Sequence, residues 1–335
     1  MNGPLVSILI PFKNTELYFL ECLASIHQQQ YQNWEVIAVN DHSSDQSLKI
    51  VQEFVLKDSR FKVLPNRGKG IIEALRLAYS HSTGALITRM DSDDVMTPDK
   101  LEIMVASLLK YGKGHVSIGQ VKYFSDRGIS NGYERYEQWL NELTINGTNY
   151  SEIYKECVIP SPCWMTYRED LENCNAFYPN RYPEDYDLTF RFYENKLKCI
   201  PCNIIVHYWR DYDNRTSRTS EHYAQNYFLD IKLHYFLKLE RNPKRPLTIW
   251  GAGAKGKTIA KLLVERNIPF YWLCDNPKKI GKEIYGQQML SFKTLSKLEK
   301  PQSIITVANE KAQEDIILFF NKLGQTHMND YFFFC

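Results

Sequence analysis

Short apolar runs alternate with segments of helical periodicity through the first 125 residues, and this alternation constrains the fold more than any other feature of the sequence. The run Leu5–Pro11 is followed by apolar residues at helical spacing within Thr15–Gln28. Three further apolar runs, each leading into a helical segment, are Trp34–Val39, Phe61–Leu64 and Ala85–Met90. Repeated strand–helix units predict an α/β fold with a mixed, mainly parallel sheet flanked by helices.

Composition narrows the class of protein. The chain has 335 residues, and its 41 Lys and Arg against 39 Asp and Glu give a formal charge of +2, which offers no electrostatic reason to expect a nucleic-acid partner. No apolar run approaches the ~18–20 residues that a membrane span needs. We therefore expect a cytoplasmic protein, with contact at the inner face of the membrane left open. The eight cysteines lack the spacing of a disulfide framework and are expected to be buried thiols.

Periodicity weakens after residue 125 and restarts near residue 243. A long amphipathic helix is expected at Ser220–Leu239, and the apolar run Leu247–Trp250 opens a new strand–helix–strand pattern that ends at Asp275. We therefore expect a first domain at residues 1–219, a connecting helix and linker at 220–243, and a small Rossmann-like α/β domain at 244–335.

Three carboxylates follow the strand predicted at Ala85–Met90, in the order Asp91-Ser92-Asp93-Asp94. Like charges this close need a counter-charge, and a hard divalent cation bound by one or two carboxylates takes its other ligands from water and phosphate oxygens. The alternative is that Asp94 and its neighbours cap the helix that Pro98 opens. Because a cap needs only one carboxylate, the cluster favours a site for a metal ion and a diphosphate.

A second acidic pair, Glu184 and Asp185, lies in the first turn of a predicted helix. The helix dipole favours the ionised form of a carboxylate there, by about 0.3–1 kcal/mol. An ionised carboxylate near neutral pH suits a general base. Acidic residues are also common in first helical turns without any catalytic role, so this pair alone decides nothing.

These motifs occur together in an order that resembles the family 2 glycosyltransferases, whose GT-A fold is a single nucleotide-sugar-binding α/β domain. The resemblance rests on Val6–Pro11 with Asn14, Val39–Asp45, Asn66–Gly70, Ala85–Asp94, Pro183–Leu188 and the arginine-containing loop Trp209–Arg218. It implies inverting, metal-dependent transfer of a sugar from a nucleotide sugar to a hydroxyl of a saccharide or glycoconjugate, as in polysaccharide synthesis. Uridine is the nucleoside that the resemblance favours.

The resemblance also implies roles for single residues. Asp91 and Asp93 would hold Mn²⁺ or Mg²⁺, Asp93 most directly. Asp185 would take the proton of the acceptor hydroxyl, with Glu184 the less favoured candidate. The residues implied to contact the nucleotide sugar are Pro11, Phe12, Asn14, Asp41, Ser43, Arg67, Lys69, Asp91, Ser92, Asp93 and Arg215.

Several positions keep two interpretations. Arg210, Arg215 and Arg218 would either clamp the diphosphate or form a solvated basic loop. His207 is either a further metal ligand or a core histidine. The chain departs from the family pattern at His42, where Gly is common, and at Arg76, where Asn is common; these changes bear on the nucleotide-side loop and on the sugar contacts.

The second domain carries a glycine pattern of its own. Gly251, Gly253 and Gly256 match GxGxxG after Leu247–Trp250, and Asp275 stands nineteen residues after Gly256, where a ribose-binding acid is expected. The pattern predicts a ligand site, but the glycines would equally permit close packing of a helix on a strand. Asp275–Gly281 resembles small Rossmann-like domains attached to sugar-modifying enzymes.

Two other functions stay open from the sequence. A nucleotide-dependent oxidoreductase or sugar-modifying enzyme centred on Gly251–Gly256 leaves Asp91–Asp94 without a role. A non-catalytic protein would bind a sugar nucleotide without turnover. Aromatic residues make up 13% of the chain, with 22 Tyr, and those ahead of the Glu184–Asp185 pair would either stack on an acceptor sugar or form ordinary core. They are Tyr133, Tyr136, Trp139, Tyr150, Tyr154, Trp164 and Tyr167.

Overall fold

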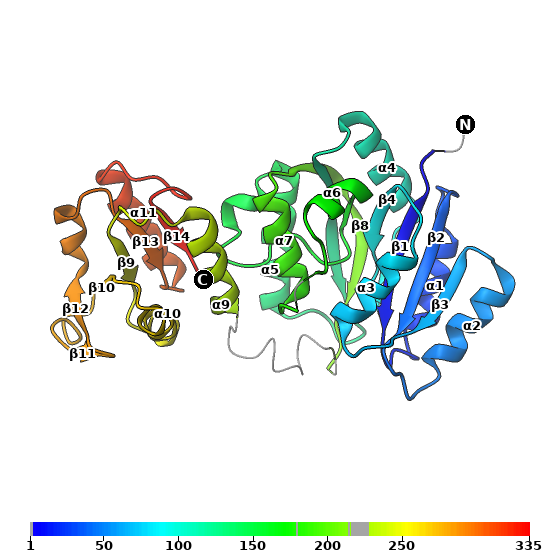
Figure 1. Ribbon diagram of the computed structural model, residues 1–335, viewed down its shortest axis with the longest axis horizontal. Coiled ribbons are helices and arrows are strands. Elements are labelled where there is room, and N and C mark those ends of the chain that lie inside the picture. Colours follow the sequence, from blue (N-terminus) through cyan, green and yellow to red (C-terminus); the bar gives the residue numbers. More distant parts are fainter. Residues whose placement is uncertain (1–2, 179, 214, 216–227) are drawn as a thin grey trace. The chain divides into compact units, whose positions relative to one another are not determined.

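The computed structural model describes residues 3–178, 180–213, 215 and 228–335, and the chain divides into two compact units (Figure 1). The first unit comprises Met1–Tyr150 and Val158–Thr216. The second comprises Ser217–Cys335 together with the short segment Ser151–Cys157. The second unit therefore includes a piece of chain from well inside the span that we expected to form the first domain.

Parallel strands form one half of the sheet in the first unit. The central strand β1 (Val6–Phe12) pairs with β2 (Trp34–Asn40) and with β4 (Leu86–Arg89), and β2 pairs with β3 (Phe61–Pro65). Each strand is an apolar run that precedes a helix, as expected. Because the strands are parallel, their carboxyl ends meet at one edge of the sheet.

Antiparallel pairing completes the sheet, in the overall order β3-β2-β1-β4-β7-β6-β8-β5. Strand β7 (Trp164–Tyr167) runs antiparallel to both β4 and β6 (His115–Phe124). Strand β6 is parallel to β8 (Lys198–Arg210), and β5 (Val95–Met96) runs antiparallel to β8. The mixed, mainly parallel α/β sheet confirms the predicted fold class.

Helices cover both faces of this sheet. Helices α1 (Phe19–His27), α2 (Ser47–Lys57) and α4 (Lys100–Tyr111) contribute to one buried core with β1, β2 and β4. Helix α3 (Ile71–His81) packs against β1 and β2. The remaining helical segments of this part of the chain are α5 (Asn131–Asn146), η1 (Asn149–Glu152), α6 (Arg168–Asn173) and α7 (Glu184–Glu194).

The helix expected from Thr15 begins only at Phe19. The backbone N–H of Thr15 donates to Ser47 Oγ (2.8 Å) and that of Glu16 donates to Asp45 Oδ2 (3.0 Å). These bonds tie the start of the segment to the loop after β2, so the first residues form a turn instead of a helix.

The second unit is a small α/β unit with sheet order β11-β12-β10-β9-β13-β14. Its strands are β9 (Leu247–Trp250), β10 (Tyr271–Cys274), β11 (Glu283–Ile284), β12 (Gln287–Ser291), β13 (Gln302–Ile305) and β14 (Tyr331–Phe333). All pairs are parallel except the short β11–β12 hairpin. Its helices are α10 (Ala254–Glu265), η4 (Phe292–Lys297) and α11 (Glu310–Lys322).

The helix expected at Ser220–Leu239 lies partly outside the described residues. Its described part is α9 (Phe228–Tyr235), which continues into one π-helical turn, η3 (Phe236–Glu240). Both belong to the second unit.

Aromatic residues from three parts of the chain build the core beside these helices. The Tyr154 ring stacks on Phe334 (5.6 Å between centroids) and meets Phe236 and Phe332 edge-on. The buried Lys232 Nζ donates to the carbonyls of Lys155 (2.8 Å) and Phe334. The segment Ser151–Cys157 is therefore part of this unit's hydrophobic core, and for Tyr154 the core interpretation is correct.

Candidate active site

Asp41 lies at the carboxyl end of β2, close to the ends of β1 and β3. Its backbone N–H donates to the Phe12 carbonyl (2.9 Å). Its Oδ1 atom accepts hydrogen bonds from Asn66 Nδ2 (2.7 Å) and from the Gly70 backbone N–H (2.9 Å), whereas Oδ2 lies 3.9 Å from Lys13 Nζ. Asp41 therefore holds the loop after β3 through one oxygen, and the other accepts no hydrogen bond within the described chain.

Asn14 and Ser43 join the loops that follow β1 and β2. Asn14 has a φ of 52°, a left-handed conformation that Asn adopts more readily than most residues. Its N–H donates to Ser43 Oγ (3.1 Å), and its Oδ1 accepts from the Ser44 N–H (2.8 Å). The Ser43 backbone N–H donates in turn to Asn40 Oδ1 (2.9 Å). Two residues expected to contact the nucleotide thus also hold the loops together.

The other residues expected on the nucleotide side differ in exposure. Pro11 and Phe12 are buried, and the Phe12 ring packs on Phe19 with centroids 4.7 Å apart. Any contact of Phe12 with a nucleotide would therefore come from its backbone. Arg67 and Lys69 are exposed, and neither forms an ion pair with another residue that the structure describes.

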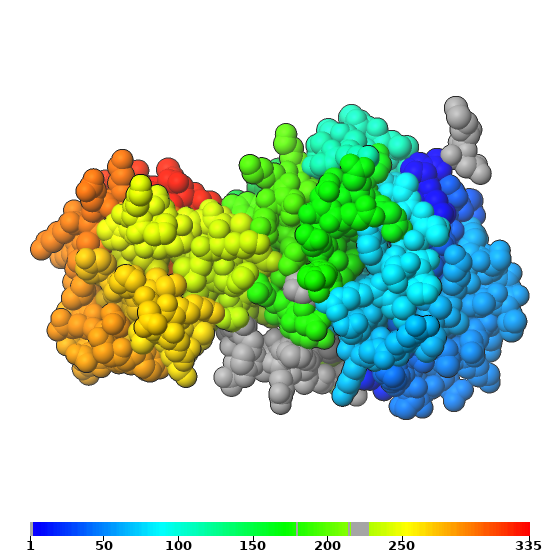
Figure 2. Space-filling view, in the orientation of Figure 1, coloured from blue at the N-terminus to red at the C-terminus, as the bar shows by residue number. Residues whose placement is uncertain are grey.

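The two departures from the family pattern have clear local roles. His42 has a φ of 60°, which explains why Gly is common there, and its Nε2 donates to the Gly68 carbonyl (2.8 Å). Arg76 donates to the Phe177 carbonyl (2.5 Å) and to Asn180 Oδ1 (2.8 Å). Arg76 therefore holds the segment that leads into α7, and Figure 2 shows that segment in green beside the α3 region in cyan.

Asp94 is fully buried and belongs to the framework of the site. Its Oδ2 accepts from His207 Nε2 (2.9 Å) and its Oδ1 from the Arg210 N–H (2.8 Å). Both oxygens thus bind β8, and no side chain caps the start of α4, so the capping interpretation of Asp94 is wrong. Since His207 is buried against Asp94, it occupies the place of a core histidine.

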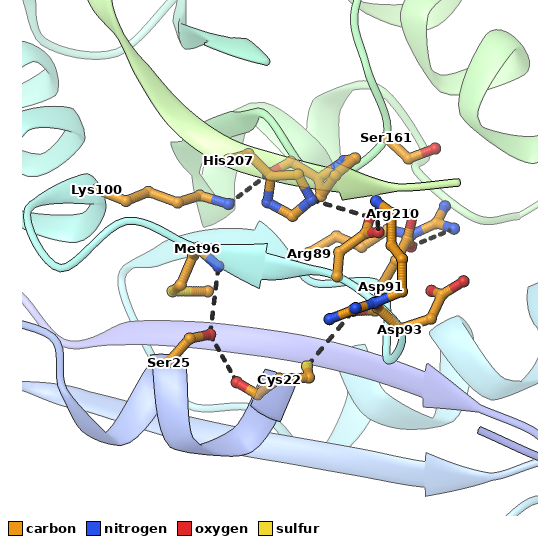
Figure 3. Close-up of polar contacts among 12 residues, drawn as sticks. Cys22, Ser25, Arg89, Asp91, Asp93, Met96, Lys100, Ser161, His207 and Arg210 are labelled. Atoms are coloured by element: carbon orange, nitrogen blue, oxygen red, sulfur yellow. Dashed lines mark hydrogen bonds and ion pairs between the residues drawn. The ribbon is translucent and has the colours of Figure 1, made fainter. Parts of the chain in front are cut away.

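Asp91 and Asp93 each keep one carboxylate oxygen without a hydrogen bond in the described chain. Oδ1 of Asp91 accepts from Arg89, and Oδ2 of Asp93 accepts from the Tyr212 hydroxyl (2.9 Å). Burial, together with the neighbouring Asp94 carboxylate, raises the pKa of Asp93 to about 7. Ser92 between them is buried. Figure 3 shows Asp91 and Asp93 on one loop, with Arg89 and Arg210 close to it.

This donor set fits a magnesium or manganese ion. No cluster of three or more His, Cys, Asp or Glu side chains suited to a metal occurs among the described residues. A site with two carboxylates is what Mg²⁺ uses when substrate phosphates and water supply the other ligands. Burial and the Asp94 carboxylate disfavour the ionised form of Asp93, and a bound divalent cation would stabilise that form.

Glu184 and Asp185 begin α7 but have different partners. Glu184 is buried, and its Oε1 accepts from Arg89 Nη1 (2.9 Å). Asp185 is partly exposed; its Oδ2 accepts from Ser161 Oγ (2.7 Å) and its Oδ1 from the Tyr186 N–H (2.8 Å). Of the two acids, Asp185 is therefore the one without a cationic partner within salt-bridge distance among the described residues.

Arginines predicted to bind diphosphate lie against aromatic rings and acids. Arg210 sits over Tyr18 (4.7 Å) and Phe124 (4.4 Å), and its Nε donates to the Asp93 carbonyl (2.8 Å). Buried Arg215 lies 4.7 Å from the Trp209 ring, and Asp94 and Asp93 keep its pKa high despite burial. Arg218 lies outside the described residues. The two described arginines are thus part of the acidic cluster's surroundings, not a solvated loop.

A pocket of about 210 Å³ opens beside these residues. Tyr18 and Tyr212 form part of its wall, with ring centroids 4.7 Å apart. The other lining residues are Ser125, Asp126, Arg127, Arg210, Asp211 and Asp213. Because Tyr212 and Arg210 both bond to Asp93, the pocket adjoins the acidic cluster.

The glycines of the second unit divide into two kinds. A Cβ on Gly251 would lie 2.3 Å from Thr306 Oγ1, and one on Gly256 would lie 2.0 Å from the Gly251 carbonyl oxygen. Close packing therefore explains both. A Cβ on Gly253 would meet nothing within 4 Å, and Asp275 is exposed at the end of β10. Ligand binding by Gly251, Gly253, Gly256 and Asp275 stays a prediction.

Sequence reasoning assigned no role to Arg89, Ser161 or Tyr212. Arg89 carried a usable signal, because a charged residue inside the apolar run Ala85–Met90 must find a partner when that strand is buried. Ser161 and Tyr212 carried none, since both reach the acids through contacts between distant segments.

No helix in the described chain is long and apolar enough to cross a bilayer.

Comparison with known proteins places the first unit in a family. The model of Glycosyl transferase family 2 matches residues 7–174. WfgD of Escherichia coli, described as a UDP-Glc:alpha-D-GlcNAc-diphosphoundecaprenol beta-1,3-glucosyltransferase, is 31% identical over 220 residues, covering 63% of this chain and 78% of WfgD.

Two solved structures share the fold at low sequence identity. S. aureus TarS 1-349 in complex with UDP-GlcNAc has a TM-score of 0.54 and 18% identity, covering 77% of this chain and 71% of TarS 1-349. The mannosyltransferase PcManGT from Pyrobaculum calidifontis, in complex with GDP-Man and Mn²⁺, has a TM-score of 0.52 and 18% identity, covering 79% and 75%. With this GT-A type fold and the match to the family model, the chain belongs to glycosyltransferase family 2 and is a glycosyltransferase.

Proposed function

We propose that the protein transfers a sugar from a UDP-sugar to a hydroxyl group of a saccharide or glycoconjugate acceptor, with inversion and with the help of a divalent cation. One observation carries the proposal. The carboxylates that follow β4 and those that begin α7 lie far apart in the chain, yet Arg89 contacts both Asp91 and Glu184 at 2.9 Å. This contact supports a site in which a metal-binding pair lies near a base on α7.

We infer that the nucleotide binds at the carboxyl ends of β1, β2 and β3. Asp41 Oδ2 is the oxygen left to accept a hydrogen bond from a nucleoside, because Oδ1 already accepts two. The names of two relatives support uridine: WfgD is described as using UDP-Glc, and TarS was solved with UDP-GlcNAc. PcManGT was solved with GDP-Man, so the nucleoside is the first point to test.

A divalent cation, Mn²⁺ or Mg²⁺, would be held by Asp93 and Asp91. When bound, it would neutralise the diphosphate that leaves. The PcManGT complex contains Mn²⁺, which supports a metal here. Arg210 and Arg215 bring further positive charge to the same region, where guanidinium groups suit phosphate oxygens.

Asp185 is the proposed base. Its carboxylate takes the proton of the acceptor hydroxyl while the acceptor oxygen bonds to the anomeric carbon, and the bond from that carbon to the diphosphate oxygen breaks. Attack from the face opposite the leaving group inverts the configuration. A positioned base of this kind contributes about 10²–10⁴-fold to the rate.

The metal is tested by binding of UDP with and without Mn²⁺, measured by calorimetry on the wild type, Asp93→Asn and Asp315→Asn. We expect Asp93→Asn, or chelator with the wild type, to weaken UDP binding at least about tenfold, since a charge-assisted contact is lost. Asp315, exposed on α11, is the matched control and should change nothing. If the wild type binds UDP equally well with Mn²⁺ and with chelator, the proposed metal dependence is wrong.

The raised pKa of Asp93 adds a pH arm to this test. A carboxylate with a pKa of about 7 holds a proton at pH 6 that the cation must displace, and loses it by pH 8. Mn²⁺-dependent UDP binding should therefore be tighter at pH 8 than at pH 6. A non-catalytic binding protein would pass both tests; sugar transfer that Asp185→Asn abolishes, with UDP affinity kept, excludes it.

A further inference from the structure

Arg89 is a buried guanidinium that joins the two acidic motifs. It is the last residue of β4 and is 5% exposed. Its Nε and Nη2 both lie 2.9 Å from Asp91 Oδ1, and its Nη1 donates to Glu184 Oε1 at 2.9 Å. One planar cation thus bridges the loop after β4 and the first turn of α7, and a charge-assisted hydrogen bond from Nε holds one oxygen of the Asp91 carboxylate.

The ion pair with Arg89 gives Glu184 a structural role that Asp185 lacks. Glu184 is buried and directed onto Arg89, so taking a proton there would discharge an ion pair held away from water. Asp185 is partly exposed and receives neutral donors, Ser161 Oγ and the Tyr186 N–H. The two acids therefore differ in role, and of the two only Asp185 is accessible to the hydroxyl of an acceptor.

We propose that Arg89 is a positioning residue of the transfer reaction. It fixes the Asp91 carboxylate on the donor side relative to the helix that carries Asp185, and Glu184 anchors that helix instead of accepting the proton. This assignment rests on the function proposed above.

A double-mutant cycle with Arg89→Lys and Glu184→Gln tests it, because both changes keep the volume of the side chains nearly constant. We would measure kcat for consumption of UDP-glucose, or of the UDP-sugar that the wild type consumes fastest, and UDP affinity with Mn²⁺. We expect each single change to lower kcat about 10–100-fold and the double change to lower it no further than the worse single one, since coupled residues act as a unit.

Binding separates the two sides of the bridge. Arg89→Lys should weaken Mn²⁺-dependent UDP binding about fivefold, because a compact ammonium lacks the planar fork with which Arg89 bonds Asp91 and Glu184 at the same time. Glu184→Gln and Asp185→Asn should leave UDP affinity within about twofold, since neither touches the donor side. Asp185→Asn should lower kcat by about 10²–10⁴.

Asp187→Asn is the matched control, because Asp187 is a buried acid in the same helical turn with an arginine partner, Arg191 (2.6 Å). It should lower the melting temperature while leaving kcat within about threefold. The assignment is overturned if the reductions in kcat caused by Arg89→Lys and Glu184→Gln multiply in the double variant. It is also overturned if Glu184→Gln is as inactive as Asp185→Asn, or if Asp187→Asn lowers kcat as much as Glu184→Gln does.

The experiment still decides if one variant fails to fold or keeps full activity. If Arg89→Lys does not fold, the comparison of Glu184→Gln with Asp185→Asn and Asp187→Asn decides by itself. If Asp185→Asn keeps full activity, the proposed base is wrong while the cycle still tests Arg89. A wild type that neither binds UDP nor consumes a UDP-sugar contradicts the proposed function and this assignment with it.

Discussion

Single side chains determine how this site is built, and several of them form hydrogen bonds that hold the surrounding loops and strands in place. Asp94 uses both carboxylate oxygens to hold β8, and Asp41 uses one to hold the loop after β3. Such roles are invisible in a motif, which shows residue types and spacing but no partners. An acidic residue in a motif is therefore a candidate for framework and for chemistry alike.

The glycines of the second unit allow a sharp test at this scale. Gly256→Ala would place a Cβ 2.0 Å from a backbone oxygen, whereas Gly253→Ala would place one in open space. We expect Gly256→Ala to lower the free energy of unfolding by about 1–3 kcal/mol or more, as overpacking does. Gly253→Ala should stay within about 0.5 kcal/mol.

Urea unfolding of the full chain measures both changes. Equal destabilisation by the two variants would contradict the packing argument. If a nucleotide binds at this turn as predicted, Gly253→Ala should weaken that binding without a loss of stability, so the same pair of variants separates packing from ligand binding.

At the scale of elements, the parallel half of the first sheet was predictable and the antiparallel half was not. Strands β1 to β4 are local apolar runs, and their carboxyl ends are where ligands collect in such sheets. Strand β7 inserts between β4 and β6, and β6 pairs with β8 through a shift of register near Gly119 and Gln120. Pairing of this kind depends on segments far apart in the chain, which no local pattern encodes.

The same distinction applies to the candidate site. Asp41, Asp91 and Asp93 stand directly after predicted strands, so their neighbourhood could be expected from the order of elements. The bonds from Arg89 to Glu184 and from Ser161 to Asp185 could not, because they join β4 and the turn before β7 to α7, and these segments are distant in the sequence.

The contact between the loops after β1 and β2 can be tested through Asn14. Asn14→Ala removes the acceptor of the Ser44 N–H and leaves a φ of 52° on a residue that disfavours it. We expect a loss of about 1–3 kcal/mol in unfolding free energy and weaker UDP binding. Asn14→Gly loses the same hydrogen bond but adopts this φ freely, so it should be milder by about 1 kcal/mol. Equal losses in urea unfolding would contradict the backbone argument.

At the scale of the whole molecule, the two units are not two consecutive stretches of chain. The segment Ser151–Cys157 leaves the first unit, supplies Tyr154 to the core of the second, and returns. A fragment that begins near residue 243, where the periodicity of the sequence restarts, would lack this ring together with α9 and η3.

Tyr154→Ala tests how much this segment matters. The ring is 1% exposed and packs on Phe334, Phe236 and Phe332, so its removal should cost about 3–5 kcal/mol. Tyr154→Phe keeps the ring and removes the hydroxyl that bonds to Glu240 Oε1 (3.3 Å), a hydrogen bond worth about 1 kcal/mol. Limited proteolysis and hydrogen exchange should show the loss in the second unit first; protection lost equally in both units would contradict the division.

The place of Tyr154 in the chain also bears on how the protein is made. A ribosome releases the segment Ser151–Cys157 long before Phe332 and Phe334, its partners on the last strand and beyond it. The first unit has all its residues by position 216 and is able to fold while synthesis continues, with this aromatic segment still uncovered. The second unit reaches its complete core only when Phe332 and Phe334 have emerged. Chaperone binding to stalled nascent chains should therefore persist until these two residues have been released.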